Sequence, residues 1–194
     1  KETEPIPEVK IIKSPELIDL EKTASRLRAE EGVTDIDGNT YKSVIIGEQE
    51  WMTENLRTSK YSDGTSIPNI TDNTAWFNNL STGFWCYYDN SSSNDATYGK
   101  LYNWYAVNTN KLCPTGWHVP TDAEWTVLTD YLAADGHSGA EGNALKSTSG
   151  WNSGGNGTDD YGWLGLPGGF RSGSSDDFYY VGGRGFWWSS SQVD

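Results

Sequence analysis

The clearest pattern along the chain is a stripe of apolar residues at helical spacing, with polar residues between them. Thr121 is followed three residues later by Glu124, which is the spacing of a capping box. Trp125, Leu128 and Leu132 then recur at intervals of three and four residues, so they share one face of a helix. We therefore predict a helix that begins just after Thr121 and buries this face.

Short runs of β-branched and aromatic residues predict strands elsewhere. Residues 33–36 and 40–46 flank the turn Asp37-Gly38-Asn39, which favours a hairpin. Further strands are expected at residues 84–88, 178–181 and 186–189, and short helical segments at residues 72–80 and 101–107. The connections are rich in glycine, asparagine and serine. This pattern is typical of an α+β domain with small antiparallel sheets and long irregular loops.

Residues 1–32 differ from the rest of the chain. Residues 1–13 contain prolines and alternating charge, which is typical of an extended linker. Ser14 and Pro15 form a good helix start, and apolar residues follow at helical spacing. We expect a short amphipathic helix that docks on the domain, with a coiled-coil stub or a stalk as alternatives. The expected organisation is an N-terminal segment followed by one domain at residues 33–194.

Composition and charge narrow the classes of function. The chain has 27 acidic and 14 basic residues, which gives a formal net charge of −13. Such a chain repels nucleic-acid phosphates and anionic membrane surfaces, so we expect neither a nucleic-acid partner nor membrane insertion. No apolar run approaches the roughly 20 residues that a membrane-spanning helix needs. The acidity has a simpler reading as well, because it keeps a secreted protein soluble.

Aromatic residues are unusually abundant, with 10 Trp and 11 Tyr, and together with Phe they make up 13% of the chain. We therefore expect the core to be built from large flat rings. We assign Trp104, Trp117, Trp125 and Trp188 to that core.

Several motifs together resemble one protein family. They lie at residues 35–41, 51–56, 98–107 (YGKLYNWYAV), 112–125 (LCPTGWHVPTDAEW), 166–171 (LPGGFR) and 186–190 (FWWSS). From about Val33 to its end, the chain resembles the Fibrobacter succinogenes major paralogous domain family. The resemblance implies a C-type-lectin-like fold, akin to that of the formylglycine-generating enzymes. It also implies a secreted or surface-anchored bacterial lipoprotein, located outside the cell or on the outer membrane.

Members of that family usually continue past the Trp-Trp-Ser-Ser segment with more strand. Because this sequence stops at Asp194, we expect the last strands to be missing. Cys86 and Cys113 are then the only intrachain pair that could form a disulfide, and the alternative is that both remain buried thiols. A sheet cut short in this way leaves an edge that is prone to pair with another chain.

No catalytic constellation stands out, so we predict that the protein is not an enzyme. His118 precedes the capped helix, where we expect it to fix the helix entry while Glu124 serves the cap. The formylglycine-generating relatives use a pair of cysteines late in the chain, and none follows Cys113 here. A glycosidase needs two facing carboxylates, and no pattern selects such a pair.

Two oxygen-rich loops are candidates for calcium, which prefers several oxygen ligands. They lie at residues 89–95 and 152–160, and neither has the spacing of an EF-hand. We favour the second loop, with Asn156, Asp159 and Asp160 as ligands. The alternative reading is that both loops are solvated turns.

Exposed aromatic residues flanked by polar ones predict a ligand surface in the late loops. Sugar-binding sites stack pyranose rings on aromatic rings and bond the hydroxyls to carboxylates, amides and guanidinium groups. The residues that fit are Trp151, Arg171, Asp176, Asp177, Tyr179 and Tyr180. We therefore expect an extracellular binding module for a glycan or a surface protein. One alternative is an assembly or tip subunit of a bacterial surface fibre whose edge accepts a partner's strand, and a less favoured one is a polysaccharide-active enzyme.

Overall fold

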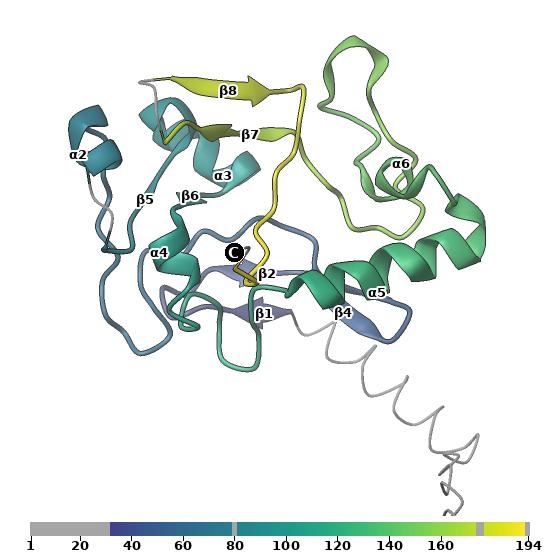
Figure 1. The fold of residues 1–194 in the computed structure, drawn as a ribbon, viewed down its shortest axis with the longest axis horizontal. Helices are drawn as coiled ribbons and strands as arrows, with labels where there is room; N and C mark the ends of the chain where they lie inside the picture. The colour runs from purple at the N-terminus through teal and green to yellow at the C-terminus, as the bar shows by residue number, and fades with distance from the viewer. Residues whose placement is uncertain (1–31, 79–80, 174–176, 193–194) are drawn as a thin grey trace, which may run out of the picture.

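A computed structural model describes residues 32–78, 81–173 and 177–192 of the chain (Figure 1). The fold is α+β, with short helices and four two-stranded antiparallel sheets in the described residues. The helix expected within residues 1–32 lies outside the described part. None of the described helices is long and apolar enough to cross a membrane.

The N-terminal part forms two hairpins, and the sequence predicted only the first of them, across the turn Asp37-Gly38-Asn39. Their strands are β1 (Val33–Thr34), β2 (Thr40–Tyr41), β3 (Ser43–Ile46) and β4 (Gln49–Met52). β1 pairs with β2, and β3 pairs with β4, both antiparallel. The first turn is held by buried Asp35, whose Oδ1 accepts the backbone N–H groups of Asp37 and Asn39, each at 2.9 Å. A buried carboxylate satisfied in this way stabilises the turn.

The middle of the chain alternates short helical turns with one small sheet. The elements are α2 (Asn73–Asn78), β5 (Trp85–Cys86), η1 (Tyr88–Asn90), η2 (Ser92–Asn94), α3 (Asp95–Tyr98), β6 (Leu101–Tyr102) and α4 (Trp104–Val107). The helix expected from Leu101 begins only at Trp104, because Leu101 and Tyr102 pair with β5 as a strand. Asn103 is the N-cap, and its side chain accepts the N–H of Ala106 at 3.1 Å.

The capped helix is confirmed as α5 (Asp122–Leu132). Both capping-box bonds are present, from Glu124 N–H to Thr121 Oγ1 at 3.2 Å and from Thr121 N–H to Glu124 Oε2 at 2.8 Å. Leu128 and Leu132 are fully buried, as the stripe predicted. The helix runs directly into η3 (Ala133–His137), which is a π-helical turn. The chain then continues through α6 (Glu141–Leu145) and η4 (Asn152–Gly154).

The late part contains one hairpin and an irregular C-terminal segment. β7 (Gly168–Arg171) pairs with β8 (Phe178–Val181), which confirms the strand expected at residues 178–181. The prediction of a strand at residues 186–189 is wrong, because this segment has no regular structure. It descends from β8 across the molecule toward β1 and β2 (Figure 1). Single contacts hold it instead of a ladder, among them Trp188 Nε1 donating to Tyr102 O at 3.0 Å.

The core mixes aromatic rings with aliphatic side chains, so the expectation of a core built from rings holds only in part, and its tryptophans are not the ones we assigned. Trp51, Trp76, Trp85 and Trp163 are the buried tryptophans. Assigning Trp188 to the core is wrong, because 45% of its surface is exposed. The other three that we assigned, Trp104, Trp117 and Trp125, are half-buried. Burial depends on contacts between distant segments, and sequence spacing does not report these.

Candidate functional site

Three of the predicted ligand residues gather at the β7–β8 hairpin. Tyr179 and Tyr180 lie on β8, and Asp177 comes immediately before it. The rings of the two tyrosines join those of Phe170 and Phe186 in one group, which we call the aromatic platform. Ring centres in it lie 5.1 Å apart for Phe170 and Phe186, 5.6 Å for Phe170 and Tyr179, and 6.0 Å for Tyr179 and Tyr180. Tyr180 and Phe186 are 48% and 50% exposed, so the platform presents bare ring surface to solvent.

The backbone under the platform is irregular. The β7–β8 pairing joins Gly168 to Val181 and Phe170 to Tyr179, and it skips Gly169 and Tyr180 between them. Both skipped residues have a left-handed backbone, with φ of 62° and 67°. Glycine adopts this conformation without cost, but a bulky tyrosine does so only under strain. Strain of this kind concentrates at functional sites, which makes Tyr180 the most informative residue of the platform.

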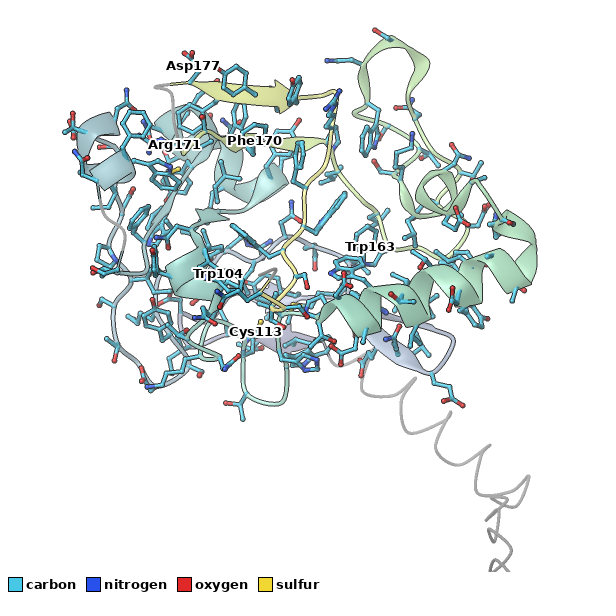
Figure 2. All side chains as sticks on the ribbon, in the orientation of Figure 1. Trp104, Cys113, Trp163, Phe170, Arg171 and Asp177 are labelled. Carbon is cyan, nitrogen blue, oxygen red and sulfur yellow. The ribbon has the colours of Figure 1, made fainter. Side chains whose placement is uncertain are left out.

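Charged groups flank the exposed rings. The guanidinium carbon of Arg184 lies 4.5 Å from the centre of the Tyr180 ring. The carboxylate of Asp177 accepts the hydroxyl of Tyr179 at 3.1 Å. Figure 2 shows Asp177, Phe170 and Arg171 together at this end of the molecule. The platform therefore combines flat apolar surface with a cation and a carboxylate at its border.

Arg171 belongs to the same hairpin but is turned into the protein. Only 7% of it is exposed, and its guanidinium donates to the backbone oxygens of Ile70 and Thr71 at 2.8 and 2.9 Å. It also donates to Asn73 Oδ1 at 2.7 Å and lies 4.3 Å from the ring centre of Trp76. These bonds tie β7 to the start of α2. Arg171 thus serves the fold, and it is not part of the platform.

Trp151 lies near the hairpin without joining the platform. Its indole N–H is shared between Ser147 Oγ and Gly165 O, both at 3.1 Å, and the ammonium of Lys146 lies 4.9 Å from its ring centre. The loop that follows is attached to the end of β8, because Asn152 N–H donates to Gly182 O at 2.7 Å. The remaining predicted ligand residue, Asp176, lies outside the described residues.

The predicted calcium ligands have separate local partners. Asn156 Oδ1 accepts the N–H of Trp151 at 3.0 Å, and Asp159 Oδ1 accepts the N–H of Leu164 at 2.9 Å. Asp160 Oδ2 accepts the hydroxyl of Thr158 at 2.7 Å. Across residues 32–78, 81–173 and 177–192, no three His, Cys, Asp or Glu side chains converge as a metal site would require. Calcium binding stays a prediction.

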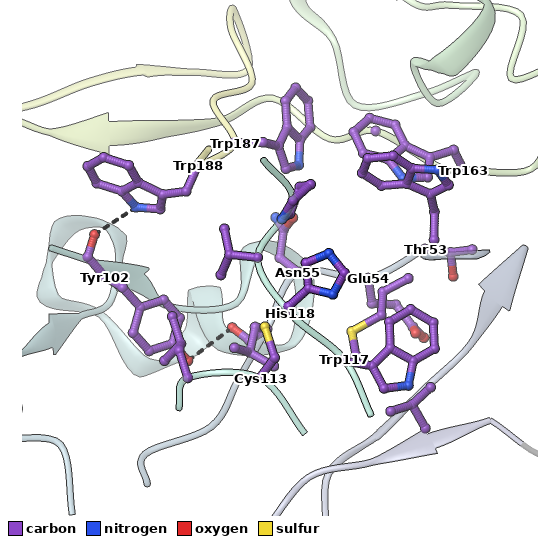
Figure 3. Close-up of a pocket in the computed structure, with 18 of the residues that line it drawn as sticks. Thr53, Glu54, Asn55, Tyr102, Cys113, Trp117, His118, Trp163, Trp187 and Trp188 are labelled. Atoms are coloured by element: carbon purple, nitrogen blue, oxygen red, sulfur yellow. Dashed lines mark hydrogen bonds between the residues drawn. The ribbon is translucent and has the colours of Figure 1, made fainter. Parts of the chain in front are cut away.

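A second feature, which sequence reasoning missed, is a cavity of about 760 Å³ (Figure 3). Its lining comes from within residues 32–34, 49–56, 98–107, 112–125, 163–169 and 186–188. Trp163, Trp187 and Trp188 lie along one side, and Cys113 and Trp117 lie on the other. Phe186 belongs to both the platform and the cavity lining. The only sequence signal for the cavity is the dense run of aromatic residues at 186–188.

Hydrogen bonds and burial shift the pKa of two titratable groups that line the cavity, Glu124 and Cys113. His118 Nε2 lies 2.8 Å from Glu124 Oε1, so the histidine braces the helix entry as expected. A hydrogen bond from the backbone of Thr121, together with His118, lowers the pKa of Glu124. Burial raises the pKa of the Cys113 thiol to about 11, which leaves it protonated and weakly nucleophilic at neutral pH.

Both cysteines are free thiols, so the predicted disulfide is not formed in this structure. Cys86 is fully buried in the core, whereas Cys113 is half-buried at the cavity. Burial raises the pKa of Cys86 to about 11 as well. Each thiol therefore packs as a small apolar group.

Comparison with known proteins gives one family. The model of the family described as Fibrobacter succinogenes major domain matches residues 44–194. No curated protein and no solved structure matches the chain.

Proposed function

The chain belongs to the Fibrobacter succinogenes major domain family, and we propose that it is a non-enzymatic binding module that recognises a glycan through its aromatic platform. The α+β architecture supports, as part of this proposal, a C-type-lectin-like fold whose late loops carry the ligand surface. We place the module outside the bacterial cell or on its outer surface, a location that rests on the family resemblance of the sequence motifs.

One observation carries the proposal: bare aromatic rings stand beside a cation and a carboxylate on strained backbone. A pyranose ring has an apolar face that packs on Tyr180 and Phe186, which are the most exposed rings of the platform. Its hydroxyl groups both donate and accept hydrogen bonds, so they suit Asp177 as acceptor and Arg184 as donor. Exposed apolar surface framed by polar groups is the usual form of a binding site.

The test is a glycan-array screen of the purified protein in calcium, repeated in chelator. We expect a defined set of glycans to bind. Loss of binding in chelator would support a calcium ion that glycan binding requires, held by Asn156, Asp159 and Asp160. A blank array obtained with folded protein would contradict glycan recognition.

A further inference from the structure

The cavity runs along the edge of a strand and its continuation. All eight consecutive residues from 49 to 56 line it. Side chains of an extended chain alternate between two faces, so a cavity over one face would touch only every second residue. Contact with every residue means that the cavity also reaches the backbone, along β4 and past the bend at Thr53 and Glu54 that ends the strand.

Part of this edge has unused backbone groups. β4 pairs with β3 on its other side, and Thr53 N–H donates to Lys42 O at 3.0 Å. Leu56 O accepts the N–H of Lys100 at 3.0 Å. Between them, the backbone N–H and C=O groups of Glu54 and Asn55 bond to no other described residue. Unpaired backbone at an edge is a template for another strand.

The rest of the cavity suits apolar side chains. Leu164, Phe186, Trp187 and Trp188 all line it, and all four are exposed large apolar residues. Together with the edge at residues 49–56, they frame a groove that offers backbone partners on one side and apolar contacts on the other. Strand-accepting grooves have this form, because main-chain bonds supply affinity and side-chain pockets supply specificity.

The charge of the groove is negative. Its ionisable lining consists of Glu50, Glu54, Glu124, Lys100 and His118, besides Tyr and Cys side chains. Lys100 is already paired with Asp95 at 3.0 Å, and His118 with Glu124 at 2.8 Å. Glu50 and Glu54 have no cationic partner among the described residues. The groove therefore favours basic residues, and a second copy of this chain, with its net charge of −13, would be repelled.

We propose that this cavity is an acceptor groove for one extended peptide strand in which apolar and basic residues alternate. The strand pairs with the backbone at Glu54, packs its apolar side chains against Trp187 and Trp188, and places its basic residues near Glu50. The groove shares Phe186 with the glycan platform, but Tyr180 does not line the cavity, so variants of Tyr180 separate the two proposals.

The test uses three synthetic nine-residue peptides and the whole chain. In the first peptide lysine and valine alternate, in the second glutamate replaces lysine, and the third is the first with alternate backbone nitrogens methylated. We expect calorimetry to show binding of the first peptide, and at least tenfold weaker binding of the other two. Amide hydrogen exchange at Glu54 should slow at least tenfold when the first peptide binds, because strand pairing protects the amide.

Glu54→Lys provides the reciprocal test. It should weaken binding of the lysine peptide about tenfold and strengthen binding of the glutamate peptide. Glu48→Lys makes the same change at an exposed residue that does not line the cavity, and it should alter neither. Tyr180→Ala should leave peptide binding unchanged, which separates this inference from the glycan proposal.

Several outcomes would overturn the strand inference. The first peptide failing to bind would do so, as would binding that leaves amide exchange at residues 53–56 unchanged. Equal binding of the methylated peptide would show that backbone pairing is not used. Self-association of the chain that is abolished by Trp188→Ser would identify a second copy as the occupant instead.

Discussion

Tyr180 concentrates the functional argument in one residue. Its backbone is left-handed while its ring is half exposed, so neither local preference nor burial explains a tyrosine at this position. Strain of about 1–3 kcal/mol is maintained only when the surrounding structure fixes it. In this account the hairpin holds that conformation in order to present the ring to a ligand.

Tyr180→Gly separates stability from binding. Glycine adopts φ of 67° without cost, so relief of strain offsets the lost ring contacts, and the free energy of unfolding should change by less than about 1 kcal/mol. Glycan binding should weaken as it does when alanine replaces Tyr180. Tyr179→Gly is the matched control, because Tyr179 pairs with Phe170 in the ladder and should lose about 1–3 kcal/mol of stability. Urea unfolding of both variants measures the difference, and a Tyr180→Gly variant as unstable as the control would refute the strain argument.

Asp37 provides a pH-dependent contribution to stability at the first hairpin. Burial opposes its ionisation, but hydrogen bonds from Lys60 and Ser59 prevail and lower its pKa to about 2. A carboxylate whose folded-state pKa is depressed stabilises the fold above its unfolded pKa of about 4, and this contribution disappears as the pH falls toward 2. Asp37→Asn should therefore cost about 1 kcal/mol at pH 7 and almost nothing at pH 2. Urea unfolding at both pH values measures this, and an equal cost at the two would contradict the assignment.

At the scale of elements, the sequence predicted features that depend on neighbouring residues, but it did not predict which distant segments pair as strands. The capping box of α5 lies within four consecutive residues, and so the sequence alone predicted it correctly. Leu101 shows the opposite case, because helical spacing suggested a helix and pairing with Cys86 made it a strand. Residues 186–189 have strand propensity but no partner strand among the described residues, and they remain irregular.

Thr121→Ala tests the contribution of the cap to stability. It removes the acceptor for Glu124 N–H at the start of α5, and it should lower the free energy of unfolding by about 1 kcal/mol. Thr126→Ala is the control, since Thr126 is exposed inside the same helix and alanine is a better helix former. Its stability should be unchanged or slightly raised. Equal losses in both variants would show that the cap has no special role.

At the scale of the whole molecule, the sequence predicted the core and the candidate binding surface only in part. Composition pointed to the aromatic rings of the interior but not to the aliphatic side chains packed among them. Asp177, Tyr179 and Tyr180 lie together because they are close in sequence. Arg171 looked equally suitable, but burial against Trp76 assigns it to the fold. The cavity could not be predicted from the sequence, because its walls come from segments more than one hundred residues apart.

Thiol titration tests the packing of the two cysteines. With both thiols free, two should react per chain after unfolding, without prior reduction. In the folded protein only Cys113 should react, and slowly, because its pKa is about 11 and Cys86 is fully buried. A count of zero in unfolded, unreduced protein would instead establish a disulfide between them.

The most direct test of the central claim is the affinity of the best array glycan for three proteins, measured by titration calorimetry. Tyr180→Ala should lose about 1–3 kcal/mol of binding free energy, which is roughly a 5- to 150-fold rise in Kd. Tyr131→Ala removes another exposed tyrosine, on α5 and outside the platform, and should bind like the unaltered chain. Equal affinity of all three proteins would contradict recognition through the platform.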